Sequence, residues 1–326
     1  KELIAAVLAR KYRTFATRGN LNNHIGVPLT LLALPPGVEV AVVEMGANAP
    51  REIAALCEIA RPTHGLITNV GRDHLEGFGS VAGVARANGE MFDFLARTGG
   101  TAFVNTREPY LAGLAAAVPR VVRYPDDDYV VESLPSDFFL RLRTAGGEVE
   151  TQMFGDYNFA NLATALCVGE HFGVADADAR AAVAAYQPAD NRSQLVRRGS
   201  NVVLLDAYNA NPSSMEAALR SFARLPAERK VVVLGDMLEM GAESETEHRA
   251  LGELLRDLRF DLVLLCGEET HHTHAAAPGS HHFTDRAALL AWLEAHPPQG
   301  AHVLLKGSRG LGLERVVEAI PGSSIA

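Results

Sequence analysis

The sequence has little cysteine, a single tryptophan and no long apolar run. Its three cysteines, Cys57, Cys167 and Cys266, stand in apolar surroundings and lack the spacing of a disulfide framework or a zinc site. We therefore expect buried thiols in a cytoplasmic protein, because a reducing compartment keeps such thiols free. The longest apolar runs, such as residues 202–205, have the length of a strand, so no segment is expected to insert into a membrane.

An excess of positive charge is also missing. The chain has 30 Lys and Arg residues against 39 Asp and Glu residues, which gives a formal net charge of −9. Because nucleic-acid-binding proteins present basic surfaces, this balance argues against DNA or RNA as the main partner. Apolar residues make up 48% of the chain and charged residues 21%, as in ordinary globular proteins, and 326 residues suffice for two domains with separate cores.

The most informative absence concerns phosphate binding. The sequence nowhere contains Gly-x-x-x-x-Gly-Lys-Ser/Thr, the loop that cradles nucleotide phosphates. Yet an expected strand at 40–44 ends in Glu44, and another at 64–69 is followed by Asp73 and His74. A carboxylate and an imidazole at neighbouring strand ends can hold a metal in the crevice where open α/β sheets bind ligands. Taken alone, Glu44 fits a salt bridge or a helix cap equally well.

The last third of the chain alternates strands and helices. Four short apolar runs each precede a helical stretch, and each run ends in glycine or a charged residue. Strands that are apolar on both faces and alternate with helices form a parallel sheet covered on both sides. We therefore predict a Rossmann-like C-terminal domain at 191–326. Its expected strands are 202–206, 231–235, 262–267 and 303–307, and its expected helices are 213–222, 246–258, 285–294 and 313–319.

Residues 1–190 are predicted to form a larger α/β domain with a central parallel sheet. Short alternating segments separated by turn residues follow this sheet in sequence and indicate an antiparallel extension. The polar stretch 186–192 contains Pro188 and marks the linker between the domains. The expected strands are 40–44, 64–69, 101–104 and 120–124, the expected helices are 2–10, 51–59, 81–95, 108–116 and 158–171, and the antiparallel segments are 129–133, 138–143 and 148–153.

Two polar clusters lie where a ligand could bind. Asn20, Asn22 and Asn23 fit plain turn chemistry, and they fit the binding of a polar substrate headgroup equally well. Asp206 follows a strand and could accept hydrogen bonds from ribose hydroxyls. The segment 211–212, Asn-Pro, fits the start of a helix, and both interpretations can hold together.

Charged side chains of the C-terminal domain point to one further site. Lys306 and Arg309 flank Ser308 after the last strand, and together they suit an anionic group. By contrast, the five histidines between 271 and 282 are not expected to hold a metal. No cysteine or carboxylate stands at ligand spacing to them, and Gly279 marks a loop.

Eight motifs, in order over nearly the whole chain, resemble those of the Mur ligases. Each motif alone is weak, but their number and order make the resemblance specific. Tyr-Asn-Ala-Asn-Pro together with Gly-Asp-Met-x-Glu-x-Gly is most similar to the members that add D-alanyl-D-alanine. The motifs are Gly-Asn-Leu-Asn-Asn-His-Ile-Gly (19–26), Val-Glu-Met-Gly-Ala-Asn (43–48), His-Leu-Glu-Gly-Phe-Gly-Ser (74–80), Asn-Arg-Ser-Gln (191–194), the segment 206–215, Leu-Gly-Asp-Met-Leu-Glu-Met-Gly (234–241), the segment 244–248 and Lys-Gly-Ser-Arg (306–309).

The resemblance implies an ATP-dependent amide ligase of peptidoglycan synthesis that requires Mg²⁺. The implied reaction adds D-alanyl-D-alanine to UDP-N-acetylmuramoyl-tripeptide through an acyl phosphate, and we expect a monomer. The family has three domains, of which this chain resembles the central ATPase domain and the C-terminal domain. Since the phosphate loop of the family ends just before the position of Lys1, we expect the front of the enzyme to be cut off and this chain alone to be inactive.

The resemblance also implies roles for single residues. Glu44 and His74 would hold magnesium, and together with Lys306 they would act in catalysis. Asn88 stands where family members often carry a Lys that supports a second magnesium. The implied nucleotide-binding residues are Asn158, Asn161, Arg192, Asp206 and Asn209, and the implied substrate-binding residues are Asn20, Asn22, Asn23 and Arg309.

Two other interpretations stay open. The missing phosphate loop and Asn88 fit a catalytically silent fragment or a nucleotide-binding relic, whereas the intact downstream motifs fit a working ligase. A folylpolyglutamate-type ligase of the same superfamily would use ATP in the same way. The acceptor that is incorporated into the product would distinguish these two ligases.

Overall fold

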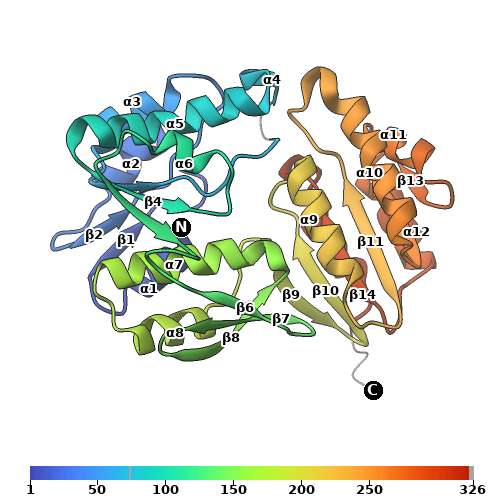
Figure 1. The fold of residues 1–326 in the computed structure, drawn as a ribbon. Coiled ribbons are helices and arrows are strands. Elements are labelled where there is room, and N and C mark those ends of the chain that lie inside the picture. Colours follow the sequence, from blue (N-terminus) through green and yellow to red (C-terminus); the bar gives the residue numbers. More distant parts are fainter. Residues whose placement is uncertain (73–74, 323–326) are drawn as a thin grey trace. The chain divides into compact units, whose positions relative to one another are not determined.

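The computed structural model describes residues 1–72 and 75–322. The chain forms two compact units, which are coloured blue to green and yellow to red in Figure 1. None of the helices in the described ranges is long and apolar enough to cross a membrane. The N-terminal unit comprises Lys1–Gln152 and Tyr157–Tyr186, and the C-terminal unit comprises Met153–Asp156 and the chain from Gln187 onward.

The N-terminal unit contains two parallel sheets. β1 (Thr14–Ala16) pairs with β2 (Val40–Val42), and β4 (Thr101–Asn105) lies between β3 (His64–Leu66) and β5 (Arg120–Tyr124). Every residue of β4 is buried, as expected for the middle strand of a covered parallel sheet. The strands predicted at 40–44 and 64–69 are correct in place but too long, because their ladders stop before the polar residues that follow.

Helices cover these sheets and enclose an apolar core that includes Leu56 and Phe92 (Figure 1). The longest helix has clear limits in the sequence, because Ser80 caps its first turn by accepting from the Gly83 N–H at 3.1 Å, and Gly99 ends it in a left-handed conformation. The helices are α1 (Glu2–Leu8), α2 (Gly26–Leu32), α3 (Glu52–Ala60), α4 (Leu75–Phe78), α5 (Val81–Thr98), α6 (Leu111–Leu114), α7 (Phe159–His171) and α8 (Asp176–Ala185).

Three of these helices, α2, α4 and α8, were not predicted. α2 opens with Gly-Val-Pro, which is a weak helical signal although proline is tolerated in the first turn. α8 is rich in alanine and lacks a clear apolar stripe, so periodicity does not reveal it. The helix predicted at 108–116 is correct in place but consists of a single turn, α6.

The antiparallel extension is a three-stranded sheet in the order β6-β7-β8. It consists of β6 (Glu132–Leu134), β7 (Phe139–Thr144) and β8 (Gly147–Phe154), and β6 runs antiparallel to β7. The turn between β7 and β8 uses Gly147 with a positive φ of 129°. The first of the three predicted segments is shifted, because residues 129–131 precede β6.

The C-terminal unit contains one six-stranded sheet in the order β13-β12-β11-β14-β10-β9. All neighbouring pairs are parallel except β9 and β10, which are antiparallel. The last long strand in sequence, β14, therefore lies between the first two parallel ones. The strands are β9 (Gln194–Arg198), β10 (Asn201–Asp206), β11 (Lys230–Gly235), β12 (Leu262–Cys266), β13 (His281–Phe283) and β14 (His302–Lys306).

The four predicted strands of this unit are confirmed, whereas the two outermost strands were missed. β9 and β13 lie at the edges of the sheet and lack the continuous apolar run of a strand buried on both faces. The helices are α9 (Pro212–Ala223), α10 (Ser244–Leu258), α11 (Thr270–Ala276), α12 (Arg286–Ala295) and α13 (Val316–Ala319), with short 3₁₀ turns at Asp156–Asn158, Gly241–Glu243, Arg309–Leu311 and Leu313–Arg315.

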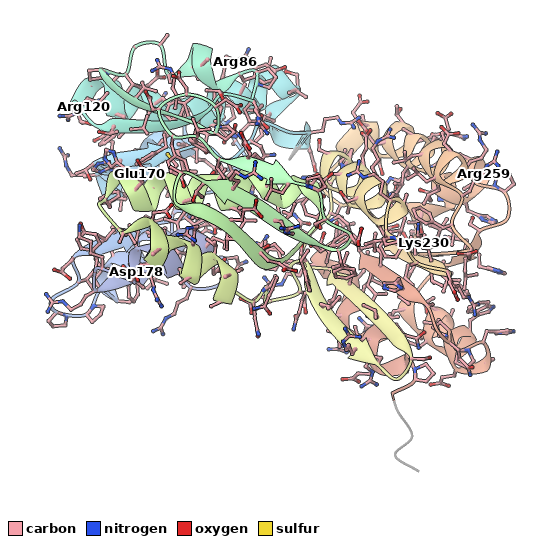
Figure 2. The ribbon with its side chains drawn as sticks, turned by 60° about the horizontal axis from the view of Figure 1, so that its bottom comes forward. Arg86, Arg120, Glu170, Asp178, Lys230 and Arg259 are labelled. Carbon is pink, nitrogen blue, oxygen red and sulfur yellow. The ribbon has the colours of Figure 1, made fainter. Side chains whose placement is uncertain are left out.

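The cysteine side chains are buried, as the sequence predicts, and most charged side chains lie at the surface. Cys57, Cys167 and Cys266 are free and buried. Charged residues such as Arg86 and Asp178 lie on the outside of the units (Figure 2).

The start of α9 gives a first prediction. The Asn211 side chain accepts from the Ser214 N–H at 2.7 Å, and the Ser214 hydroxyl accepts from the Asn211 N–H at 3.1 Å. Replacing Asn211 with alanine should lower the free energy of unfolding by about 1 kcal/mol, because a helix N–H loses its partner. Urea denaturation measures this change. The control Asn209→Ala removes an exposed amide and should change stability much less; equal losses would contradict the capping role.

Candidate active site

Glu44 follows β2 and contacts groups from three other segments. Its backbone N–H donates to the Thr17 hydroxyl at 3.0 Å, and the Asn22 amide donates to its Oε1 at 2.9 Å. The Lys1 ammonium lies 3.4 Å from Oε2. The side chain remains 29% exposed, so it is both a salt-bridge partner and accessible to a ligand. Both interpretations of Glu44 made from the sequence therefore stay compatible with the structure.

The three neighbouring amides have different surroundings. Asn22 contacts Glu44, and a Cβ on Gly46 would lie only 2.9 Å from its amide nitrogen, so glycine permits this approach. Asn23 accepts from the N–H groups of Ile25 and Gly26 at 3.1 and 2.9 Å, which is turn chemistry at the start of α2. Asn20 is exposed. The substrate-binding role of the three stays a prediction.

His74, the second predicted metal ligand, lies outside the described residues. The nearby Gly77 is exposed but closely approaches another segment, since a Cβ there would lie 1.8 Å from the Asn48 carbonyl oxygen. Any side chain at this position would push the two segments apart. The glycine of this motif is thus required for the close packing of α4 against the loop after β2.

Asn158 and Asn161 lie together at the start of α7. The Asn161 amide donates to the Asn158 Oδ1 at 2.9 Å, and Asn158 is buried. This contact fixes both amides at the positively polarised end of a helix, a suitable place for a polar ligand. Their predicted contact with adenine is not tested by the structure.

In the C-terminal unit, Asp206 and Lys306 form a buried ion pair. Parallel pairing places the two residues opposite each other at the carboxyl ends of β10 and β14, and Asp206 Oδ2 lies 2.6 Å from Lys306 Nζ. Asp206 Oδ1 also accepts from the Ser193 N–H at 3.0 Å, and Lys306 donates to the Asn209 carbonyl at 3.3 Å. The Lys306 side chain is 3% exposed. The structure therefore pairs Asp206, which was predicted to contact ribose, with Lys306, which was predicted to bind an anionic group.

Two arginines flank the Tyr208 ring. The guanidinium carbon of Arg192 lies 3.5 Å from the ring centre, and that of Arg309 lies 5.5 Å from it. Cation–π attraction favours both cations near this ring. Sequence analysis assigned no role to Tyr208, although its place between Asp206 and Asn209 was a signal for one.

The segment that carries Arg192 is conformationally strained. Asp190, Asn191 and Ser193 all have left-handed backbone conformations, with φ of 54°, 59° and 48°. Such residues cost energy and cluster at functional sites. The Asn191 carbonyl also accepts from the Tyr208 N–H at 3.2 Å, which ties this segment to the end of β10.

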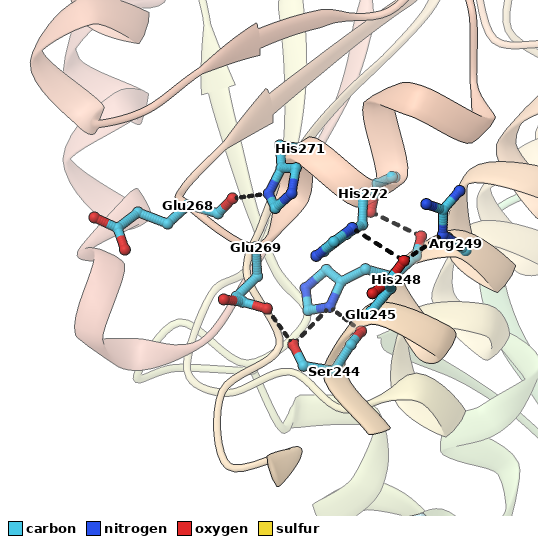
Figure 3. Close-up of polar contacts among 9 residues, drawn as sticks. Ser244, Glu245, His248, Arg249, Glu268, Glu269, His271 and His272 are labelled. Carbon is cyan, nitrogen blue, oxygen red and sulfur yellow. Dashed lines mark hydrogen bonds and ion pairs between the residues drawn. The ribbon is translucent and has the colours of Figure 1, made fainter. Parts of the chain in front are cut away.

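A buried polar network follows β11. The fully buried His248 accepts from the Met237 N–H at its Nε2, 3.1 Å away, and its Nδ1 lies 2.8 Å from the Ser244 carbonyl. Burial lowers the pKa of His248 and raises the pKa of the neighbouring Asp236, whose carboxylate accepts from the Thr270 N–H. Figure 3 shows the contacts of Ser244 with His248 and with Glu269. The hydrogen bonds of the network join the segments that follow β11 and β12, so the motif that spans 234–248 stabilises the carboxyl ends of these strands.

The remaining histidines of this unit bind protein groups. His271 contacts the Glu268 carbonyl at 2.6 Å (Figure 3), His274 contacts Ser280, and His282 contacts the Gly267 carbonyl. Over the part of the chain that the structure describes, no three His, Cys, Asp or Glu side chains form a group that could hold a metal.

Family models match both units. Residues 1–169 match the Mur ligase middle domain, and residues 191–309 match the Mur ligase, glutamate ligase domain. The chain belongs to the Mur ligase family. The resemblance stated from the motifs and the α/β fold predicted from the strand pattern are thereby confirmed.

Individual Mur ligases are similar to nearly the whole chain. A relative from Escherichia coli (strain K12), named UDP-N-acetylmuramoyl-tripeptide--D-alanyl-D-alanine ligase, is 36% identical over 98% of this chain and 74% of its own length. A crystal structure of MurF from Acinetobacter baumannii has a TM-score of 0.87 at 30% identity and covers 98% of this chain and 73% of that chain. MurF ligase from Thermotoga maritima in complex with ADP has a TM-score of 0.86 at 26% identity, with coverages of 98% and 76%.

The buried ion pair gives a second prediction. Asp206→Ala leaves the Lys306 ammonium buried without its carboxylate and should lower the free energy of unfolding by about 3–5 kcal/mol. The double variant Asp206→Ala, Lys306→Met should regain most of this loss, because it removes the unpaired charge. Chemical denaturation measures both changes.

The exposed pair between Glu245 and Arg249, at 2.9 Å, provides a matched control (Figure 3). Glu245→Ala should change stability little, since an exposed pair is screened by water. If Asp206→Ala has no larger effect than Glu245→Ala, the burial argument for the Asp206–Lys306 pair is wrong.

Proposed function

We propose that this Mur ligase adds D-alanyl-D-alanine to UDP-N-acetylmuramoyl-tripeptide with consumption of ATP, a step of peptidoglycan synthesis. The observation that carries this proposal is the similarity to the Escherichia coli ligase of that name over nearly the whole chain. The ADP complex of the Thermotoga maritima relative supports ATP as the nucleotide. We further propose that the protein acts as a cytoplasmic monomer.

Glu44 is proposed to bind Mg²⁺ together with the phosphates of ATP. Magnesium sites in nucleotide-dependent enzymes use one or two carboxylates plus substrate phosphates, so a single partly exposed carboxylate fits this metal. When bound, the metal neutralises negative charge on the transferred phosphoryl group. The Asn22 amide orients Glu44 by its bond to Oε1. His74 is retained as the second proposed ligand.

The nucleotide and substrate contacts keep the roles that the family resemblance implied. Asn158 and Asn161 are proposed to bind adenine through their polar edges. The roles proposed for the other residues follow their chemistry: Arg192, Asp206 and Asn209 contact the nucleotide, Lys306 acts on the reacting phosphoryl group, and Asn20, Asn22, Asn23 and Arg309 contact the substrates. The Asp206–Lys306 pair supports a joint role in which Asp206 holds Lys306 in place.

The proposed reaction has two balanced steps. A carboxylate oxygen of the tripeptide attacks the γ-phosphorus of ATP. The bond between this phosphorus and the bridging oxygen breaks, so ADP departs and an acyl phosphate forms. The amine of D-alanyl-D-alanine then attacks the acyl carbon, loses a proton and displaces inorganic phosphate. Fixed cations such as Lys306 and Arg309 would stabilise negative charge on the phosphoryl oxygens, a role that preorganised donors perform well.

The decisive test measures phosphate release and product mass. The full-length protein should release phosphate only when ATP, Mg²⁺, the tripeptide nucleotide and D-alanyl-D-alanine are all present. The product should then have gained one D-alanyl-D-alanine. Incorporation of glutamate into a folate would instead support the folylpolyglutamate-type alternative, and no turnover with any acceptor would support a catalytically silent protein.

Glu44→Gln gives a third prediction. The change removes the charge that attracts magnesium and should lower turnover by roughly 10- to 100-fold or more, while the melting temperature stays close to that of the parent. Glu58→Gln, an exposed carboxylate change on α3, is the matched control and should leave turnover unaltered. Unchanged turnover of Glu44→Gln at saturating magnesium and ATP would count against the metal-binding role.

A further inference from the structure

A cavity of about 610 Å³ opens at the start of β3, β4 and β5 in the N-terminal unit. Its volume lies in the range of small-molecule sites. None of the residues proposed above for the ligase reaction lines it. The cavity therefore calls for an explanation of its own.

The strand register places the cavity at one edge of the sheet. His64, Thr101 and Arg120 are the first residues of β3, β4 and β5; Thr101 pairs with both of the others, and all three line the cavity. Ligands of open α/β sheets bind at the carboxyl ends of the strands. This cavity lies at the amino ends, so it is distinct from the place where the nucleotide is expected.

All titratable side chains in the wall of the cavity are basic. They are Arg61, His64, Arg120 and His171, and the described lining residues include no aspartate or glutamate. Arg61 and Arg120 are exposed, and the Arg120 guanidinium donates to the Gly99 carbonyl, which leaves further N–H donors for a ligand. Pro62 adds apolar surface to the same wall, and the buried Phe94 packs behind it. A cavity of this composition is suited to an anion that carries an organic group.

The two histidines form a hydrogen-bonded pair. Their Nε2 atoms lie 3.2 Å apart, and the Nδ1 of His64 lies 3.0 Å from the Thr63 hydroxyl oxygen. In the neutral pair, a single proton lies between the two Nε2 atoms. One further proton can be added without losing either bond, because His64 can donate from both nitrogens while His171 keeps a proton on Nδ1. The pair can therefore carry one positive charge next to Arg120.

We propose that this cavity binds the phosphate group of a small phosphorylated molecule. Arg61, Arg120 and the His64–His171 pair supply the positive charge. A guanidinium matches the geometry of phosphate oxygens, and a phosphate dianion makes fuller use of several converging cations than a carboxylate does. Pro62 contacts the organic part of the molecule. The proposal is independent of the ligase activity.

Binding should be coupled to proton uptake. Burial lowers the pKa of His64, and His171 and Arg120 lower it further; burial also lowers the pKa of His171. A bound anion favours the imidazolium form, so the pKa in the complex exceeds that of the free protein. Affinity is then highest below the free pKa and falls as the pH rises through the pKa of the complex.

The other polar and charged groups near the His64–His171 pair either bind other protein groups or do not line the cavity. Lys11, after α1, donates to the carbonyls of Phe172 and Gly173 just beyond α7. Glu170 precedes His171, is exposed and does not line the cavity, and Figure 2 labels both Glu170 and Arg120. Tyr12 donates to the Phe172 carbonyl, and Arg97 of α5 pairs with Glu58 of α3.

The test uses isothermal titration calorimetry with inorganic sulfate, whose charge is constant from about pH 5.5 to about pH 8, around the ordinary pKa of histidine. Arg120→Gln and His171→Gln should each weaken sulfate binding about tenfold or more, since each removes a charged donor. Arg123→Gln, an exposed arginine of β5 outside the cavity, is the matched control and should bind normally. In the parent protein, affinity should fall by up to about tenfold per pH unit as one proton is released.

Two results would overturn the proposal: no sulfate binding by the parent protein, or equal affinity in the Arg120, His171 and Arg123 variants. Circular dichroism establishes that each variant is folded. Proton NMR of the histidine rings in the parent protein gives a readout that needs no variant. Sulfate should shift the ring signals of His64 and His171, and unshifted signals at saturating sulfate would exclude this site.

Discussion

The common direction of neighbouring strands is the constraint on which both units depend. Parallel strands begin at one edge of a sheet and end at the other, so residues far apart in sequence meet at strand ends. Asp206 and Lys306 are 100 residues apart, yet pairing of β10 with β14 brings their charges to 2.6 Å. The same rule gathers His64, Thr101 and Arg120 at the amino ends of β3, β4 and β5. In the C-terminal unit the carboxyl ends of the strands carry residues of the proposed ligation, and in the N-terminal unit the amino ends of β3, β4 and β5 form the basic cavity.

Much of the fold could be predicted because buried parallel strands have a strong sequence pattern. Runs such as Val-Val-Val-Leu in β11 are apolar on both faces and bounded by polar residues or glycine, which fixes their type and approximate ends. β9 and β13 could not be found in this way, because an edge strand has one side without a strand partner and tolerates polar residues. The order of the strands in the sheet could not be predicted either, since the hydrophobic pattern of a strand does not identify the strands that pair with it.

The candidate site was predictable in its residue types more than in its contacts. Strand ends revealed Glu44 and Asp206, but the three asparagines at 20–23 look alike in sequence, and only the tertiary approach of Gly46 selects Asn22 as the partner of Glu44. The stacking of Arg192 on Tyr208 depends on left-handed residues that no local pattern announces. The His64–His171 pair joins residues 107 positions apart and leaves no signal in the sequence.

The position of β14 has a consequence for synthesis of the chain. This strand is made last among the six, yet it lies between β11 and β10, so the C-terminal sheet lacks its middle until residues 302–306 have left the ribosome. Up to that point β10 and β11 have no common neighbour and expose unpaired edges. Since domains fold as units during translation, the C-terminal unit can complete its core only after β14 has been made. A chain released early would carry two half-sheets with open edges and would be a natural substrate for chaperones.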